Sequence, residues 1–337
     1  MNKKKVLLIR LDKIGDLICT LPADQILDEK IYDITWIVQK GMGEIVQLGL
    51  KNRKFIELDK KSKKESSDFL KNFLIKNHFD IVISFQSPWW VNFQLFKSGI
   101  SNRIGVLSQW HSFLFLNNGI RQKRSDSIKH EFEYNLDLVK KITGPLSIDS
   151  KNVFFQIKKP NSSEILEKYQ LQDKNYVVVH PGMMGSALNW SEENYMEYIV
   201  KILQQKQTVV ITGTESDTPY LLKIKNKFKE NSTVVWLQSQ LSLTELVQIL
   251  NYSSWVVAPS TGVAHLASNL GKIVLGIYSP LQVHHPIRWS PRGPQGLSFF
   301  PEKIKCPAKH QCLKQKCMHY NCMNLIQIPV SPIQSTT

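Results

Sequence analysis

Short apolar segments alternate with amphipathic ones along this chain, and the alternation runs through two successive halves. The first half is predicted to hold strands at Lys5–Arg10, Ile34–Val38 and Asp80–Phe85, and a helix at Glu131–Lys141. The second half is predicted to hold strands at Tyr176–His180, Gln207–Thr212, Thr233–Leu237, Trp255–Ala258 and Lys272–Tyr278. Strands that alternate with helices are typical of parallel sheets covered by helices. The sequence therefore predicts an α/β fold with two Rossmann-like domains.

The length of 337 residues agrees with two domains of ordinary size. A polar segment at 156–174 is interpreted as the linker followed by the first helix of the second half. The expected domains are residues 1–158 and 170–300, followed by a cysteine-rich segment at 301–337. Ligands of open parallel sheets lie beyond the carboxyl ends of the strands, so the two domains are expected to face a central cleft.

Two helix starts are marked in the second half. Glu192 and Glu193 follow Ser191, and acidic residues are favoured in the first turn of a helix. Ser242 with Glu245 three residues later is the pattern of a capping box, in which each side chain bonds the other residue's backbone N–H. Helices are therefore predicted to begin after Ser191 and after Ser242.

The net charge is +15, from 43 Lys and Arg against 28 Asp and Glu. This charge fits a polyanionic partner, and it fits equally well a lysine-rich solvated surface. Lysines cluster at Lys51–Lys64 and at Lys303–Lys316. Neither cluster has the aromatic and glycine pattern of common RNA-binding modules, so no nucleic-acid partner is expected. No apolar run approaches the roughly 20 residues that span a bilayer. The apolar run Val6–Ile9 is too short for a signal peptide, which favours a cytoplasmic protein.

The first candidate site is the turn after the first strand, Arg10–Asp16 (RLDKIGD). Gly15 permits a tight turn or a close backbone approach. Asp16 lies where the next helix is expected to begin. It either caps that helix or acts as a general base that takes the proton of an attacking hydroxyl. The loop matches neither the dinucleotide-binding fingerprint nor the P-loop.

Two further turns follow strands of the second half. In His180–Trp190 (HPGMMGSALNW), Gly182 and Ser186 offer backbone N–H groups and a hydroxyl to a phosphate, whereas Trp190 is interpreted as a packing residue. In the next turn, the carboxylate of Glu215 could accept hydrogen bonds from a ribose.

The fourth candidate site is Ser260–His265 (STGVAH), where small hydroxyl residues and glycine open a helix after a buried strand. Unpaired N–H groups, hydroxyls and the positive end of the helix dipole favour an anion there. His265 lies about one turn into the helix and is either structural or part of this site.

Aromatic residues gather at Phe85–Phe96, which includes Trp89 and Trp90. This stretch is interpreted as core, with a surface that contacts a membrane or an acceptor as the alternative. The basic candidates for contacts with acceptor phosphates are Arg103, Arg121, Lys123 and Arg124.

Taken in chain order, the four candidate sites resemble glycosyltransferase family 9, the ADP-heptose:lipopolysaccharide heptosyltransferases. The family has an R-x-D-x-x-G-D loop, an H-P-G loop that ends in tryptophan, a turn with a small residue and Glu, and a D-S-G or S-T-G turn before H-L-A. The segments that match these four motifs are Arg10–Asp16, His180–Trp190, Gly213–Glu215 and Ser260–Ala267. Leu21–Ala23 (LPA), which follows the first loop, also looks like the family.

The resemblance implies a GT-B fold and an inverting, metal-independent transfer that needs no cofactor. It implies ADP-heptose as the donor, held mainly by the second domain, and a lipopolysaccharide core or similar lipid-linked glycan as the acceptor. The enzyme is then expected in the cytoplasm, including a peripheral position on the inner face of the cytoplasmic membrane, with that anionic surface as a partner.

The resemblance also implies roles for single residues. Asp16 is the expected catalytic base, and Arg10 and Lys13 are expected to bind the acceptor. The expected donor-binding residues are Gly182, Ser186, Thr214, Glu215, Ser260, Thr261, Gly262 and His265. Two positions depart from the family pattern: Leu188 stands where many members have Lys or Arg, and Ser260 where many have Asp. Lys13, Arg10 or backbone N–H groups would then balance the charge of the donor.

Four of the five cysteines lie in one C-terminal stretch, at Cys306, Cys312, Cys317 and Cys322. Four thiolates can bind zinc tetrahedrally, but the first spacing is wider than in paired zinc knuckles. A reduced segment without metal is the favoured interpretation, and a structural metal site is the alternative.

Three other functions stay open. The chain could be a GT-B transferase with a different donor, such as a UDP- or GDP-sugar. It could be a non-catalytic module that binds a nucleotide or a glycan. A basic nucleic-acid binder ranks last, because the charge lies in scattered clusters while the small-residue turns recur at the strand ends. Binding to generic DNA or RNA that depends steeply on salt, without binding of a nucleotide sugar, would favour it.

Overall fold

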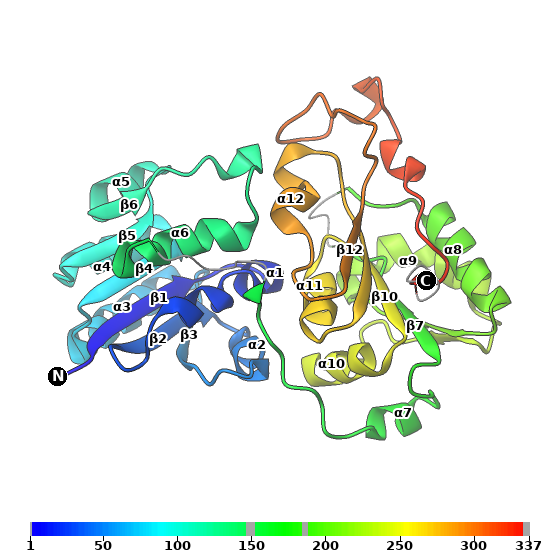
Figure 1. Ribbon diagram of the computed structural model, residues 1–337, viewed down its shortest axis with the longest axis horizontal. Coiled ribbons are helices and arrows are strands. Elements are labelled where there is room, and N and C mark those ends of the chain that lie inside the picture. Colours follow the sequence, from blue (N-terminus) through cyan, green and yellow to red (C-terminus); the bar gives the residue numbers. More distant parts are fainter. Residues whose placement is uncertain (1, 146–151, 184–187, 333–337) are drawn as a thin grey trace. The chain divides into compact units, whose positions relative to one another are not determined.

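The computed structural model describes residues 2–145, 152–183 and 188–332. The chain forms two compact units, one of residues 1–124 with 129–156 and one of residues 125–128 with 157–337 (Figure 1). Among the described residues, none of the helices has the length and apolar character needed to cross a membrane.

The N-terminal unit holds a parallel sheet in the order β3-β2-β1-β4-β5-β6, the common order of dinucleotide-binding folds. Its strands are β1 (Lys4–Arg10), β2 (Tyr32–Gln39), β3 (Lys54–Leu58), β4 (Ile81–Gln86), β5 (Asn102–Val106) and β6 (Asn118–Ile120). Its α-helices are α1 (Ile14–Ile18), α2 (Gly43–Leu48), α3 (Lys63–Asn77), α4 (Trp89–Lys97), α5 (Trp110–Phe115) and α6 (Glu131–Thr143).

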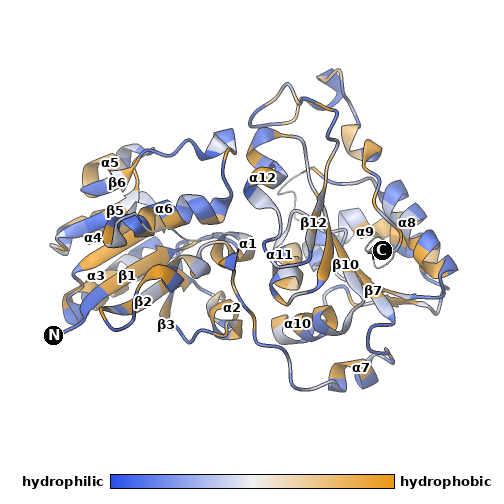
Figure 2. Cartoon of the chain, viewed as in Figure 1, coloured by the Kyte–Doolittle hydropathy of each residue, from blue (hydrophilic) through white to orange (hydrophobic). Residues whose placement is uncertain are grey.

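The core of this unit forms because the central strands are apolar on both sides. Strand β1 is buried from Val6 onward, and the central strands β1 and β2 carry hydrophobic colours in Figure 2. Alternate residues of β1, Leu7 and Ile9, join one cluster with Leu70 of α3 and Leu95 of α4. Helix α6 packs against β4, β5 and β6 instead.

The aromatic stretch Phe85–Phe96, at the end of β4 and in α4, divides between core and surface. Phe85 and Trp90 are buried as predicted, but Trp89 and Phe96 are exposed, so the core interpretation is wrong for these two. A helix that packs with one stripe against a sheet leaves its other side in solvent. This second side of α4 is therefore aromatic.

The C-terminal unit repeats the same strand order, as β12-β11-β10-β7-β8-β9, with every pair parallel. Its strands are β7 (Tyr176–Val179), β8 (Thr208–Ile211), β9 (Val234–Trp236), β10 (Trp255–Pro259), β11 (Ile273–Ile277) and β12 (Gly296–Phe299). Its α-helices are α7 (Glu164–Lys168), α8 (Glu192–Gln204), α9 (Thr218–Phe228), α10 (Leu243–Tyr252), α11 (Gly262–Asn269) and α12 (Pro286–Trp289).

The C-terminal segment completes the core of this unit. Met323 and Ile326 join a cluster with Trp190 and with residues of α8 and α9. Trp190 donates from Nε1 to the carbonyl of Ile326 at 3.1 Å, and its ring packs edge-on against Tyr195. The interpretation of Trp190 as a packing residue is thus confirmed.

The strands predicted from the sequence are present, and both predicted helix starts are confirmed. Ser191 caps α8, and Ser242 with Glu245 forms the capping box of α10. The strand at Lys272–Tyr278, the last one predicted, is β11, and the unpredicted strand β12 pairs beyond it. Of the strands without a prediction, β3, β6 and β12 lie at sheet edges, whereas β5 lies inside its sheet between β4 and β6. Edge strands have one side in solvent and carry a weaker apolar pattern.

Candidate functional site

The loop after β1 brings one guanidinium and several carboxylates together. Arg10, the last residue of β1, is almost completely buried. Its Nη2 donates to Oδ1 of Asp16 at 2.7 Å, and its Nε lies 3.0 Å from Oδ2 of Asp12. Lys13, not Asp16, is the N-cap of α1, and it makes no side-chain capping bond. Asp16 is therefore held by Arg10 inside the first turn, and the capping interpretation does not apply to it.

A third carboxylate lies behind Arg10. Glu131, the first residue of α6, is fully buried, with Oε1 at 3.5 Å from Nη1 of Arg10 and at 2.5 Å from Nη1 of Arg124. Buried charges are stable only when they are paired. The pairing explains why Arg124, a candidate for acceptor phosphate, is buried in this network instead of lying on the surface.

The surroundings change the acidity of Asp16, whose side chain is 26% exposed. Burial raises the pKa of Asp16 above its usual range, Arg10 partly offsets this, and the charges of Asp12 and Glu131 raise it further. Burial lowers the pKa of Arg10, but the carboxylates of Asp16, Asp12 and Glu131 outweigh it, so Arg10 stays charged. A carboxylate with a raised pKa is a stronger proton acceptor.

Other basic candidates of this unit have different surroundings. Lys13 is exposed beside the loop. Arg103 donates to the backbone carbonyls of Phe115 and Ile100. Arg121 and Lys123 are exposed and line a hollow of about 400 Å³ after β5 and β6.

In the C-terminal unit, the turns after three neighbouring strands carry the expected donor residues. The strands β10, β7 and β8 are adjacent and parallel, so their carboxyl ends lie on one edge of the sheet. Gly182 follows β7, Thr214 and Glu215 follow β8, and Ser260 follows β10. The structure therefore brings these turns to one edge, as ligand sites of such sheets require. Ser186 lies outside the described residues.

Gly182 is needed because Asp217 approaches it closely. A Cβ added at Gly182 would lie 2.2 Å from Cγ of Asp217, well inside contact distance. Asp217 accepts hydrogen bonds from the backbone N–H and the hydroxyl of Thr214 at 2.9 and 2.8 Å. The two turns are thus locked together, and Glu215 is left exposed beside them.

The turn before α11 presents an open hydroxyl. Thr261 is the N-cap of α11 but makes no side-chain capping bond. Its Oγ1 is buried and, within the residues that the structure describes, has no hydrogen-bond partner. Buried polar groups are rarely left unsatisfied. A helix N-terminus favours anions, and the Thr261 hydroxyl lies at the N-terminus of α11.

Two histidines beside these turns are neutral. Burial lowers the pKa of His180 to about 4, against a smaller opposing effect of Asp217, and it lowers the pKa of His265 to about 4. His180 Nδ1 lies 2.9 Å from the hydroxyl of Thr212. Leu188 packs against the hydrophobic core, so no cation stands at that position.

The C-terminal cysteines lie around one hollow of about 500 Å³. All four are free, and burial together with the nearby thiols raises the pKa of Cys322. Within residues 2–145, 152–183 and 188–332, no group of three or more His, Cys, Asp or Glu side chains is placed to hold a metal ion.

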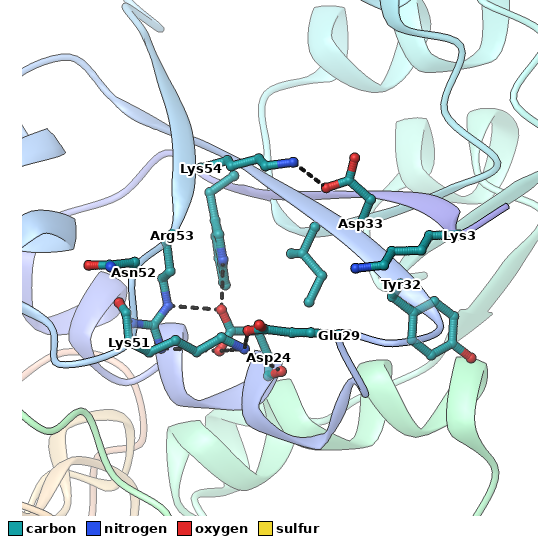
Figure 3. A pocket seen from close by; sticks show the side chains of 11 residues that line it. Lys3, Asp24, Glu29, Tyr32, Asp33, Lys51, Asn52, Arg53 and Lys54 are labelled. Atoms are coloured by element: carbon teal, nitrogen blue, oxygen red, sulfur yellow. Dashed lines mark hydrogen bonds and ion pairs between the residues drawn. The ribbon is translucent and has the colours of Figure 1, made fainter.

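A separate charged cluster lies at the amino ends of β2 and β3, which is the opposite edge from Asp16. Asp24, fully buried, accepts from Nε1 of Trp36 at 3.0 Å and from Nε and Nη2 of Arg53 at 2.8 and 3.1 Å. Lys51 lies 3.4 Å from the same carboxylate, beside a hollow of about 170 Å³ (Figure 3). These paired charges fix the 3-10 helix Leu21–Ile26 onto the sheet.

Comparison with known proteins identifies relatives over most of the chain. The family model of glycosyltransferase family 9 (heptosyltransferase) matches residues 69–318. A Haemophilus influenzae protein with the provisional name of glycosyltransferase is 27% identical over 302 residues, 86% of each chain. The lipopolysaccharide core heptosyltransferase OpsX of the same species is 22% identical over 298 residues, 86% of this chain and 82% of OpsX.

A solved structure shows the same fold. The Escherichia coli heptosyltransferase WaaC, determined with ADP, superimposes with a TM-score of 0.67 at 18% identity, over 87% of this chain and 92% of WaaC. The predicted α/β, GT-B fold with two Rossmann-like domains is thereby confirmed, as is the predicted resemblance to the matching family.

Proposed function

The chain belongs to glycosyltransferase family 9, and we propose that it transfers a heptose from ADP-heptose to a lipopolysaccharide core or similar lipid-linked glycan, with inversion at the anomeric carbon. The observation that carries this proposal is the carboxylate of Asp16, held by a buried arginine at the carboxyl edge of the N-terminal sheet. OpsX, a heptosyltransferase of the lipopolysaccharide core, supports the acceptor class. The WaaC structure determined with ADP supports the nucleotide.

Asp16 acts as the general base in this proposal. It takes the proton of the acceptor hydroxyl while the oxygen forms a bond to the anomeric carbon of the donor. The bond from that carbon to the diphosphate breaks at the same time, and its electron pair leaves with the nucleotide. Arg10 acts through Asp16, because its donors are directed at carboxylates. Lys13, exposed beside Asp16, remains the proposed contact with the acceptor.

The donor is proposed to bind the C-terminal unit. Thr261 would donate its open hydroxyl to the diphosphate, and Ser260, Gly262 and the N-terminus of α11 would add further donors. Such fixed dipoles stabilise the negative charge that develops on the leaving group. Thr214 and Glu215 would contact the nucleoside. Gly182 and Ser186 belong to the same proposed set, and neutral His265 would donate a hydrogen bond but no charge.

We propose that the domain of residues 1–158 binds the acceptor and that the domain of residues 170–300 binds the donor. No cofactor or metal takes part in the proposed steps. An acceptor anchored in lipid places the reaction at the inner face of the cytoplasmic membrane, so we propose a cytoplasmic and peripheral location. Such a surface is anionic, in keeping with the net charge of +15.

The experiment compares ligand binding and transfer in matched variants. ADP, UDP and GDP are tested for stabilisation against heat, because a ligand of the native state raises the melting temperature. We expect ADP to stabilise the wild type and Asp16→Asn alike. Transfer from ADP-heptose should fall by about 10²–10⁴-fold in Asp16→Asn and stay unchanged in Asp68→Asn, an exposed position on α3.

Each contrary result favours a different alternative. Stabilisation by UDP or GDP but not ADP would replace the donor and keep the transferase. Stabilisation by ADP without transfer by the wild type would favour a non-catalytic binding module. Full activity of Asp16→Asn would remove Asp16 from the role of base.

A further inference from the structure

Helix α5 of the N-terminal unit buries polar side chains and exposes apolar ones. Its sequence is WHSFLF, and the buried residues are the polar His111 and Ser112. Trp110, Phe113 and Leu114 are 65%, 61% and 60% exposed. A surface helix normally buries its apolar stripe and exposes its polar one, so this helix is suited to contact something outside the unit.

Buried hydrogen bonds hold α5 in this orientation. Nδ2 of Asn92 on α4 lies 3.0 Å from Nδ1 of His111 and 3.3 Å from Oγ of Ser112. Oδ1 of Asn92 accepts from Ser84 of β4 at 3.0 Å. Rotating α5 to bury its aromatic side chains would break these bonds and leave buried polar groups unsatisfied, which is costly. The outward aromatic face is therefore a fixed feature of the fold.

The apolar surface continues onto α4. Phe115 of α5 packs against Phe93 and Phe96 of α4, with ring centroids 5.3 and 5.8 Å apart, and Phe93 packs in turn against Trp89 at 6.5 Å. We call the exposed apolar residues of α4 and α5 the aromatic surface: Trp89, Phe96, Trp110, Phe113 and Leu114. Exposed apolar groups gathered in this way mark interaction sites.

Cations surround the aromatic surface, and acids are absent from the segment that forms it. Lys63 lies over the ring of Trp89 at 4.3 Å, and Lys97 over that of Phe93 at 4.8 Å. Residues 81–125 contain no Asp or Glu and five Lys and Arg, of which Arg124 is buried against Glu131. Arg121 and Lys123 line the 400 Å³ hollow together with Trp110 and Phe113.

We propose that the aromatic surface docks on an anionic phospholipid bilayer. Trp, Phe and Leu side chains insert at the boundary between headgroups and acyl chains, while surrounding Lys and Arg meet the lipid phosphates. The charge pattern favours this occupant over a second copy of the chain, because a twofold contact would bring two acid-free basic segments together. The proposal deepens the proposed function, since an acceptor anchored in lipid would be presented at the same bilayer.

The test uses the full chain and vesicles of two compositions, pure phosphatidylcholine and phosphatidylcholine with phosphatidylglycerol. Binding is measured by co-sedimentation at two salt concentrations. We expect binding to the anionic vesicles that weakens with salt. The triple variant Trp110→Ser/Phe113→Ser/Leu114→Ser should lose at least about tenfold in affinity, because three apolar side chains no longer insert. The variant Arg121→Glu/Lys123→Glu should lose the preference for anionic vesicles.

A matched control replaces exposed apolar residues elsewhere. Leu222, Ile287 and Leu325 are 56%, 54% and 64% exposed and lie in the C-terminal unit. Their triple replacement by Ser should leave vesicle binding unchanged. Far-ultraviolet circular dichroism and stabilisation by ADP establish that each variant is folded.

Three outcomes would overturn the proposal: no binding of the wild type to anionic vesicles, equal binding by the aromatic triple variant, or a concentration-dependent dimer that only this variant abolishes. Vesicle binding is read without any transfer reaction. Vesicle binding without ADP stabilisation or transfer would therefore refute the proposed function and leave the docking surface standing. Transfer to an acceptor without vesicle binding would refute the docking surface and leave the proposed function standing.

Discussion

Arg10 donates a 2.7 Å hydrogen bond to Asp16, and the same guanidinium lies 3.5 Å from the fully buried carboxylate of Glu131. The side chain of Asp16 is partly exposed to solvent, whereas Glu131 is fully buried, and both carboxylates lie against the guanidinium of Arg10. Glu131 is thus a positioning residue in the proposed reaction: its charge neutralises part of Arg10 and fixes where the guanidinium points.

The pH dependence of transfer tests this relationship. The charge of Glu131 raises the pKa of Asp16, so Glu131→Gln should lower it. The base then stays ionised in more acidic solution, and the acid limb of the kcat/KM profile moves to lower pH. A role of Glu131 in folding alone would lower activity at every pH without moving the limb. Asp137→Asn, on the same helix and paired with Lys129, is the control and should leave the profile unchanged.

The sequence indicates Asp16 but not Glu131, for a physical reason. Asp16 follows a buried strand together with Gly15, and such a turn is a local pattern. Glu131 is 121 residues further along the chain from Arg10, and it meets Arg10 only after the sheet has formed and α6 has packed on it. An acid at the start of a helix is usually a solvated partner of the helix dipole, so nothing local distinguishes this one.

Stability should fall in weakly acidic solution because two histidines are buried as neutral groups. The pKa of His180 and of His265 is about 4 in the folded chain, against roughly 6.5 when unfolded. As the pH falls from about 6.5 to 4, the unfolded chain takes up protons that the folded chain refuses, so the free energy of unfolding decreases. Below pH 4 both states are protonated and this contribution levels off.

Urea denaturation across this pH range measures the effect. His265→Gln cannot titrate, so its free energy of unfolding should depend less steeply on pH between about 4 and 6.5 than that of the wild type. An unaltered slope in His265→Gln would show that this imidazole does not resist protonation in the folded chain.

Gly182→Ala should disturb the proposed donor site through Asp217. The new methyl group would lie 2.2 Å from Cγ of Asp217, and Asp217 holds Thr214 by two hydrogen bonds. Relief of this overlap should cost about 1–3 kcal/mol of stability and weaken stabilisation by ADP. Gly213→Ala is the comparison, because its methyl group would overlap Cδ1 of Leu221, at 2.9 Å, and would lie only at ordinary contact distance from Cβ of Asp217, at 3.5 Å. Equal ADP stabilisation in both variants would show that the Gly182 turn does not shape the nucleotide site.

The sequence predicts the central strands better than the outer ones. Strands such as β1 and β10 lie between two neighbours and read as continuous apolar runs. The edge strand β3 (KFIEL) carries charges at two of its five positions. The need for glycine at position 182 could not be predicted from the sequence either, because the residue that approaches it closely, Asp217, belongs to another turn. Local patterns and the order of the elements can be predicted from the sequence, but the contacts between side chains that are distant along the chain cannot.

The capping box of α10 was predicted from the spacing of Ser242 and Glu245 alone, and its contribution to stability can be measured. Ser242 Oγ accepts from the backbone N–H of Glu245 at 3.2 Å, and Glu245 accepts from the N–H of Ser242 at 2.9 Å. Ser242→Ala removes the first bond and should lower the free energy of unfolding by about 1 kcal/mol. Ser254→Ala serves as control, since Ser254 is not a helix cap and bonds only a loop carbonyl. Urea denaturation decides the matter: if Ser242→Ala is as stable as the wild type, water replaces the cap without cost and α10 is held by its buried face alone.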